Sequence, residues 1–67
     1  MTTATPRVVQ LLYTPKEAAE ALRIGRSTLY ELLATGDVKS IKIGRSRRIR
    51  HDDLASYVAR LHHESVH

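Results

Sequence analysis

The sequence predicts a mainly α-helical fold with a small β-hairpin, in the order helix, helix, hairpin, helix. Two short segments with helical apolar spacing are separated by a link of about three residues that contains a glycine. From residue 39 the apolar spacing changes to every second residue, which is typical of strands, and after residue 51 the helical spacing returns. At 67 residues, the chain is expected to form at most one domain with a thin core.

The segment YTPKEAAEALRI opens with a dense helix-start signal. Thr14 is the expected N-cap, Pro15 occupies the first helical position, and Glu17 follows the cap by three residues, which completes a capping box. A helix is therefore expected over residues 15–22. Its expected apolar positions are Ala18, Ala21 and Leu22.

The next segment, RSTLYELLAT, predicts a second helix over residues 26–35. Leu29, Leu32 and Leu33 repeat the helical spacing, and Gly36 is a suitable C-cap. The short link that precedes this helix matches a helix-turn-helix, in which the two helices cross steeply.

The stretch IKIGRSRRIR predicts a β-hairpin whose register the sequence leaves open. A two-residue loop at Gly44-Arg45 suits a type II′ turn but pairs Ile41 with Arg48. A three-residue loop instead sets Ile41 opposite Ile49 and Lys42 opposite Arg48, which separates an apolar face from a basic one. We favour the three-residue loop because it lets the isoleucines pack together on the helices.

The final segment, HDDLASYVARLHH, predicts a third helix over about residues 52–62. Two aspartates stand where the helix dipole favours negative charge. The apolar positions are Leu54, Tyr57, Val58 and Leu61. The expected organisation is a flexible N-terminal arm over residues 1–10, a domain over residues 11–62 and a disordered tail over residues 63–67.

Positive charge is concentrated in the predicted hairpin. The twelve residues from 39 to 50 hold six of the eleven basic side chains and no acid, whereas the other fifty-five hold five basic and seven acidic side chains. A like-charge pair across two strands destabilises an isolated hairpin unless an anion lies over it, and a phosphate backbone supplies that anion. The alternative is a solvated edge strand that uses charge to block aggregation.

The outer face of the second predicted helix offers side chains suited to reading bases. Ser27 can bond to several base edges, and the Glu31 carboxylate can accept from cytosine N4. Tyr30 and Arg26 flank them. A bundle corner with a solvated outer face is the alternative, and the adjacent basic hairpin argues against it.

Several function classes find little support in the sequence. The chain has no cysteine, and His62, His63 and His67 lie near its end with Glu64 as the nearby carboxylate, so no metal site or cofactor is expected. Glycine-rich elbows, phosphate loops and paired carboxylates are absent, so an enzyme is not expected. Without an apolar run of membrane length or a secretion signal, we expect a cytoplasmic, nucleoid-associated protein.

The run from Leu11 to Leu61 resembles the excisionase-type DNA-binding domain, a small winged helix-turn-helix related to the DNA-binding domain of MerR regulators. It covers about three quarters of the chain. The resemblance lies in four motifs in order, which are T-P-x-E-A-A from Thr14, R-S-T-L-Y from Arg26, G-R-S-R-R-I from Gly44 and D-D-L from Asp52. Family members often have Ser or Thr where Gly25 stands, so a weaker cap is expected here. Many also have a second basic residue near the position of Glu31, so the family's base preference is not carried over to this chain.

The resemblance implies that the second helix enters the major groove and the hairpin wing lies along the backbone or an adjacent minor groove. The family's wing arginine corresponds to Arg48. The expected DNA-binding residues of the helix are Arg26, Ser27, Thr28, Tyr30 and Glu31. Those of the wing are Lys39, Lys42, Arg45, Arg47, Arg48 and Arg50.

The function expected from these features is that of an excisionase, a recombination directionality factor. It would bind repeated sites on double-stranded DNA beside an attachment site, bend the DNA and direct an integrase towards excision. A small stand-alone transcription regulator with the same fold is the alternative, and a neighbouring integrase gene would favour the excisionase. We expect a monomer in solution that self-associates along DNA repeats.

Overall fold

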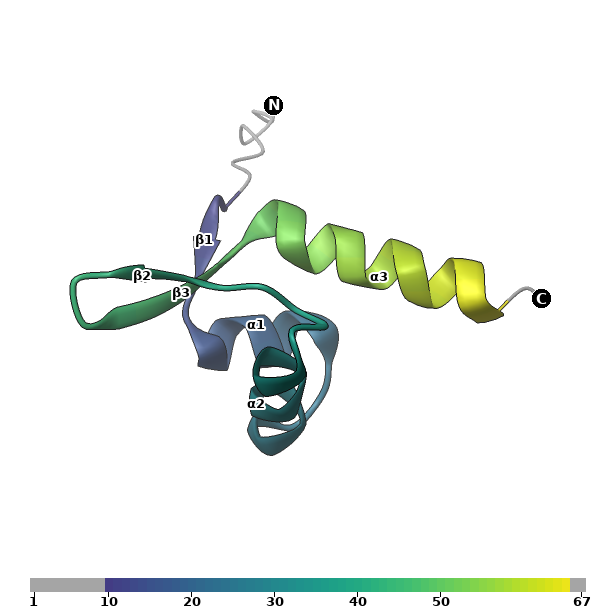
Figure 1. The fold of residues 1–67 in the computed structure, drawn as a ribbon, viewed down its shortest axis with the longest axis horizontal. Helices are drawn as coiled ribbons and strands as arrows, with labels where there is room; N and C mark the ends of the chain where they lie inside the picture. Colours follow the sequence, from purple (N-terminus) through teal and green to yellow (C-terminus); the bar gives the residue numbers. More distant parts are fainter. Residues whose placement is uncertain (1–9, 66–67) are drawn as a thin grey trace, which may run out of the picture.

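The computed structural model describes residues 10–65 of the chain (Figure 1). Its elements in order are β1 (Leu12–Tyr13), α1 (Pro15–Leu22), α2 (Arg26–Thr35), β2 (Ile41–Ile43), β3 (Ser46–Arg50) and α3 (His51–Ser65). This is the predicted winged helix-turn-helix, mainly α with a small hairpin, and it gains a short first strand. The expected N-terminal arm over residues 1–10 falls outside the described residues except for Gln10.

Helix α1 begins with the predicted capping box. The amide of Glu17 donates to the Thr14 hydroxyl at 3.1 Å, and the Glu17 carboxylate accepts from the Thr14 amide at 3.0 Å. The helix ends at Arg23, which adopts the left-handed conformation with φ 59°. The Ile24 amide then donates to the Ala19 carbonyl at 3.0 Å, so backbone hydrogen bonds shape the tight turn into α2.

Six apolar side chains, each at most 6% exposed, form the core beneath the helices and the sheet: Ala18, Ala19, Leu29, Val38, Ile49 and Leu54. Small alanines on α1 let α2 approach closely. Leu33 is half-buried at the edge of this core. On α1 the buried positions are Ala18 and Ala19, whereas the expected core position Ala21 is exposed.

The hairpin register differs from the favoured prediction. Strands β2 and β3 join through a two-residue turn at Gly44-Arg45, and Gly44 has φ 64°, as a type II′ turn requires at its first central residue. Ile41 therefore lies opposite Arg48, and Lys42 lies opposite Arg47. The prediction of a three-residue loop is therefore wrong.

Strand β1 adds a third strand beside β3. Tyr13 pairs with Ile49 in a three-stranded antiparallel sheet of order β1-β3-β2. Ile49 is fully buried in the core, while Ile41 and Ile43 remain 40% and 54% exposed. The expectation that all three isoleucines hold the wing to the helices is correct for Ile49 alone.

Helix α3 is longer than predicted. It begins at His51, whose amide donates to the Leu11 carbonyl at 2.9 Å, and it continues to Ser65. Residues 63–65, expected in a disordered tail, are helical because neither glycine nor proline ends the helix after His62; residues 66–67 lie outside the described part. Figure 1 shows α3 and the hairpin projecting to opposite sides of the domain. Within residues 10–65, no helix is both long and apolar enough to span a bilayer.

Candidate nucleic-acid interface

Helix α2 presents its polar side to solvent. All five side chains expected to contact DNA from this helix are exposed: Arg26, Ser27, Thr28, Tyr30 and Glu31. Leu29, on the opposite side, is fully buried and fixes the rotation of the helix about its axis. The N-cap residue Gly25 has no side chain to cap the helix, as the comparison with the family pattern predicted.

The wing concentrates exposed positive charge around its turn. Lys42 and Arg47 lie directly opposite one another, and Arg45 occupies the second turn position; all three are exposed. The predicted like-charge cross-strand pair therefore exists, but its members are Lys42 and Arg47 instead of Lys42 and Arg48. Like charges at this spacing repel, and a polyanion lying over the wing relieves that repulsion.

Arg48 lies at the base of the wing and is half-buried. Its guanidinium Nη1 donates to the Arg47 carbonyl at 2.9 Å. Its positive charge also acts on Glu17, whose pKa is lowered mainly by the hydrogen bond from the Thr14 backbone, with smaller contributions from Gln10 and Arg48. Arg48 is thus less exposed than Arg45 and Arg47.

Arg50 is engaged by α3 and does not extend from the wing. Its Nε and Nη2 atoms donate to the two carboxylate oxygens of Asp53 at 2.8 and 3.0 Å. This bidentate bond is the main cause that lowers the pKa of Asp53 and raises that of Arg50. Lys39 adds to the lowering of the Asp53 pKa and lines the same hollow as Arg50 and Asp53. The six basic residues therefore divide into a wing group and a pair beside α3.

Arg60, which was not among the predicted functional residues, links α3 to the connection between α2 and the wing. Its guanidinium donates to the Asp37 carbonyl and lies 5.8 Å from the centre of the Tyr57 ring. Asp37 in turn accepts from the Thr35 hydroxyl at 2.8 Å. These contacts hold the end of α2 against α3. The signal available in the sequence was the i, i+3 spacing of Tyr57 and Arg60.

The histidines of α3 do not form a metal site with acids in the described part of the chain. Across residues 10–65, no group of three or more His, Cys, Asp and Glu side chains is arranged to hold a metal ion. His67 lies outside this range.

Comparison with known proteins places these features in a family. The model of a family described as "Helix-turn-helix domain" matches residues 12–62. A protein of Streptomyces ambofaciens named "Excisionase" is 38% identical over 58 residues, which cover 87% of each chain. A protein of Saccharopolyspora erythraea named "Probable excisionase" is 44% identical over 52 residues; the match covers 78% of this chain but only 53% of that protein. No solved structure matches the chain.

Proposed function

Because the chain belongs to the excisionase-type helix-turn-helix family, we propose that it is a sequence-specific DNA-binding accessory factor, an excisionase, and not an enzyme. In this proposal it acts on double-stranded DNA in the nucleoid, beside an attachment site, and directs an integrase towards excision. The observation that supports DNA binding best is the exposed Lys42–Arg47 pair next to Arg45 on the wing of a helix-turn-helix. Such a charge arrangement favours a polyanion over a protein partner.

Helix α2 is proposed to enter the major groove with its exposed side. Ser27 and Glu31 would face base edges, and the Glu31 carboxylate selects cytosine by accepting from its N4 amino group. Arg26, Thr28 and Tyr30 would contact the flanking phosphates and bases. The wing would contact the DNA phosphate backbone beside an adjacent minor groove through Arg45, Arg47 and Lys42. Arg48 would support the base of the wing.

DNA bending is proposed to arise from the other face of the wing. Ile41 and Ile43 share that face and keep 40% and 54% of their surface exposed although the core lies nearby. Apolar side chains inserted into a minor groove unstack base steps and kink the duplex. The flanking arginines would draw the wing to the groove, and the isoleucines would then favour bent DNA.

Sequence reading by α2 is tested by selecting sites from random DNA with two matched variants. Glu31→Ala should change the selected base at one position, because the cytosine contact is lost. Glu20→Ala, which removes an exposed glutamate from α1 instead, should leave the selected site unchanged. Identical sites for wild type and Glu31→Ala would show that Glu31 does not read a base.

Excision is tested in vitro with the purified chain, its cognate integrase and DNA that holds the attachment sites. The expected result is stimulation of excision that rises with protein concentration and saturates. DNA binding without any stimulation would exclude the excisionase role. It would favour a transcription regulator of the same fold, for which a reporter driven by the bound promoter is the direct measurement.

A further inference from the structure

A short connection, residues 36–40, joins helix α2 to the wing. Its middle residue Val38 is buried in the core, and the Val38 amide donates to the Leu32 carbonyl of α2 at 3.2 Å. Asp37, the residue before it, is exposed, and its backbone carbonyl accepts from the Arg60 guanidinium of α3. The path of the chain from α2 to the wing is therefore fixed from two sides, by the core and by α3.

The hydrogen bond between Arg60 and Asp37 closes a loop that contains the whole wing. The two residues are 23 positions apart, and between them the chain runs through β2 and β3 and then into α3. Where β3 ends, Arg50 donates to both carboxylate oxygens of Asp53 on α3. Helix α3 thus contacts both chain segments at the base of the wing, the one that leads into β2 and the one that leaves β3.

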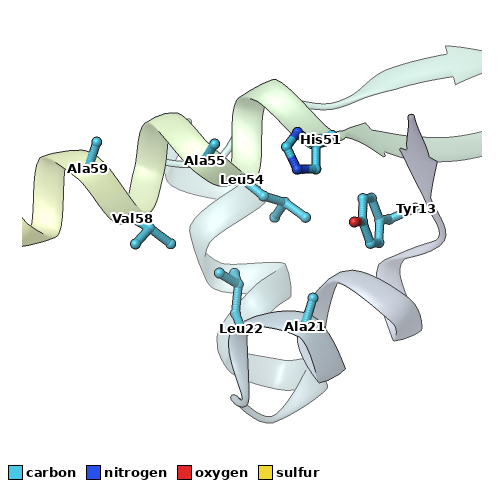
Figure 2. Close-up of a pocket in the computed structure, with 8 residues that line it drawn as sticks. All are labelled: Tyr13, Ala21, Leu22, His51, Leu54, Ala55, Val58 and Ala59. Carbon is cyan, nitrogen blue, oxygen red and sulfur yellow. The ribbon is translucent and has the colours of Figure 1, made fainter. Parts of the chain in front are cut away.

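On another side, α3 lies along an open apolar groove of about 430 Å³ beside α1. Figure 2 shows Leu22 on α1 and Val58 on α3 on either side of this space. The sequence pattern predicted Val58 and Leu61 on the packed face of the helix, but they are 49% and 43% exposed. Because apolar packing is weak in this half of α3, the contacts of Tyr57 and Arg60 contribute more to its direction.

The position of the Arg60 guanidinium is well defined. The Tyr57 side chain beneath it is half-buried and packs against the core. The guanidinium lies 5.8 Å from the centre of the Tyr57 ring, and the attraction between cation and ring favours this position. Asp37 is held in turn, because its carboxylate accepts from the Thr35 hydroxyl at 2.8 Å. A planar guanidinium can stack on the ring and still donate to the carbonyl, which suits arginine better than lysine.

We propose that Arg60 is a positioning residue for DNA recognition. Through the Asp37 carbonyl it fixes the base of the wing relative to α2, and therefore the distance between the contacts that these two elements make with one duplex. Lys42 and Arg47 repel each other across the hairpin, so the hairpin alone fixes the wing poorly before it binds. A wing whose base is already in place loses less conformational freedom on binding. This inference rests on the proposed DNA-binding function.

Amide hydrogen exchange followed by NMR tests the contact itself, without DNA. Arg60→Ala places a good helix former at an exposed position, so the domain is expected to stay folded. The Val38 amide should exchange about fivefold faster in this variant, as the loss of one neighbouring hydrogen bond implies. The Ile24 amide, which donates to the Ala19 carbonyl before α2, should keep its rate. His62→Ala, which truncates a nearby exposed side chain of α3, is the matched control and should change neither rate.

A double-mutant cycle of Arg60→Ala with Arg47→Ala tests the consequence for DNA binding. Arg47 belongs to the hairpin and Arg60 to α3, and these elements project to opposite sides of the domain (Figure 1). Substitutions at distant, independent sites multiply their effects on affinity to within about twofold. If Arg60 positions the wing, the factor by which Arg47→Ala weakens binding should be more than about twofold smaller in the Arg60→Ala background, because a displaced wing has less contact to lose.

Independent effects of the two substitutions would overturn the positioning role. If Arg60→Ala also reduced the salt slope by about 0.9, Arg60 would be a phosphate contact instead. An unchanged Val38 exchange rate, or an equal rise for Val38 and Ile24, would show that Arg60 does not hold the connection. Failure of the wild-type chain to bind DNA would refute the proposed function, while the exchange rates would still decide whether Arg60 holds the connection.

Discussion

Two arginines on the same strand give the sharpest test of the interface. Arg47 and Arg50 both belong to β3 and are both exposed. The Arg47 guanidinium has no hydrogen bond or ion pair with the rest of the described chain, whereas Arg50 is held by both oxygens of Asp53. We expect Arg47→Ala to remove a phosphate contact. Arg50→Ala should instead lower the melting temperature and leave the salt dependence of DNA binding unchanged.

The size of the effect follows from the number of exposed basic side chains at the proposed interface. There are four such side chains: Arg26, Lys42, Arg45 and Arg47. They predict a slope of about −3.6 for log affinity plotted against log salt concentration, and a slope of about −2.7 after Arg47→Ala. Raising the salt from about 50 to about 200 mM should then weaken wild-type binding about 150-fold but weaken the variant only about 40-fold.

Fluorescence anisotropy with one labelled duplex, measured across this salt range, gives the slopes, and circular dichroism gives the melting temperatures. Equal flattening of the slope by Arg47→Ala and Arg50→Ala would refute the division of the basic residues into a wing group and a pair beside α3. An unchanged slope for Arg47→Ala would show that the Lys42–Arg47 pair does not face phosphate.

Three further predictions concern stability. Leu29→Ala should cost about 2–5 kcal/mol in urea unfolding because Leu29 is fully buried, and Leu33→Ala should cost less because Leu33 is half-buried. The folded-state pKa of Glu17 lies below its ordinary value of 4.5, so its stabilising effect is present above pH 4.5 and is lost as the pH falls through the folded value. The melting temperature should thus fall more steeply on acidification for the wild type than for Glu17→Gln, which keeps a capping side chain. Gly25→Ser should raise the melting temperature by adding a cap worth a few tenths of a kcal/mol, since Gly25 has extended backbone and open space around its Cβ position.

Features set by neighbouring residues could be predicted from the sequence. The capping box at Thr14 and Glu17 depends on a three-residue spacing, and the bounds of α1 and α2 follow from caps at each end. The exposed side of α2 is likewise fixed once Leu29 is placed in the core. Caps and helical spacing are local, so no knowledge of the rest of the fold was needed.

Features set by distant residues could not be predicted. Strand β1, in which Tyr13 pairs with Ile49, has only two residues and no periodicity of its own, so the sequence did not reveal it. Arg50 could be recognised as a partner of Asp53 only after β3 was known to run directly into α3, which places the two side chains together. The exposure of Val58 depends on how far α3 extends past α1, and the helical pattern alone is the same for a packed helix and an unpacked one.

The observed register also separates the demands of folding from those of DNA binding. Of the three isoleucines of the hairpin, Ile49 is the one buried in the core, whereas Lys42 lies against Arg47 at the surface and Ile41 and Ile43 stay exposed. Repulsion between the two basic side chains opposes hairpin formation in the free protein and is relieved on a polyanion. The wing is thus expected to gain order from its ligand. The predicted three-residue loop would have produced the opposite arrangement, with an apolar face packed on the helices and a wing that was rigid before binding.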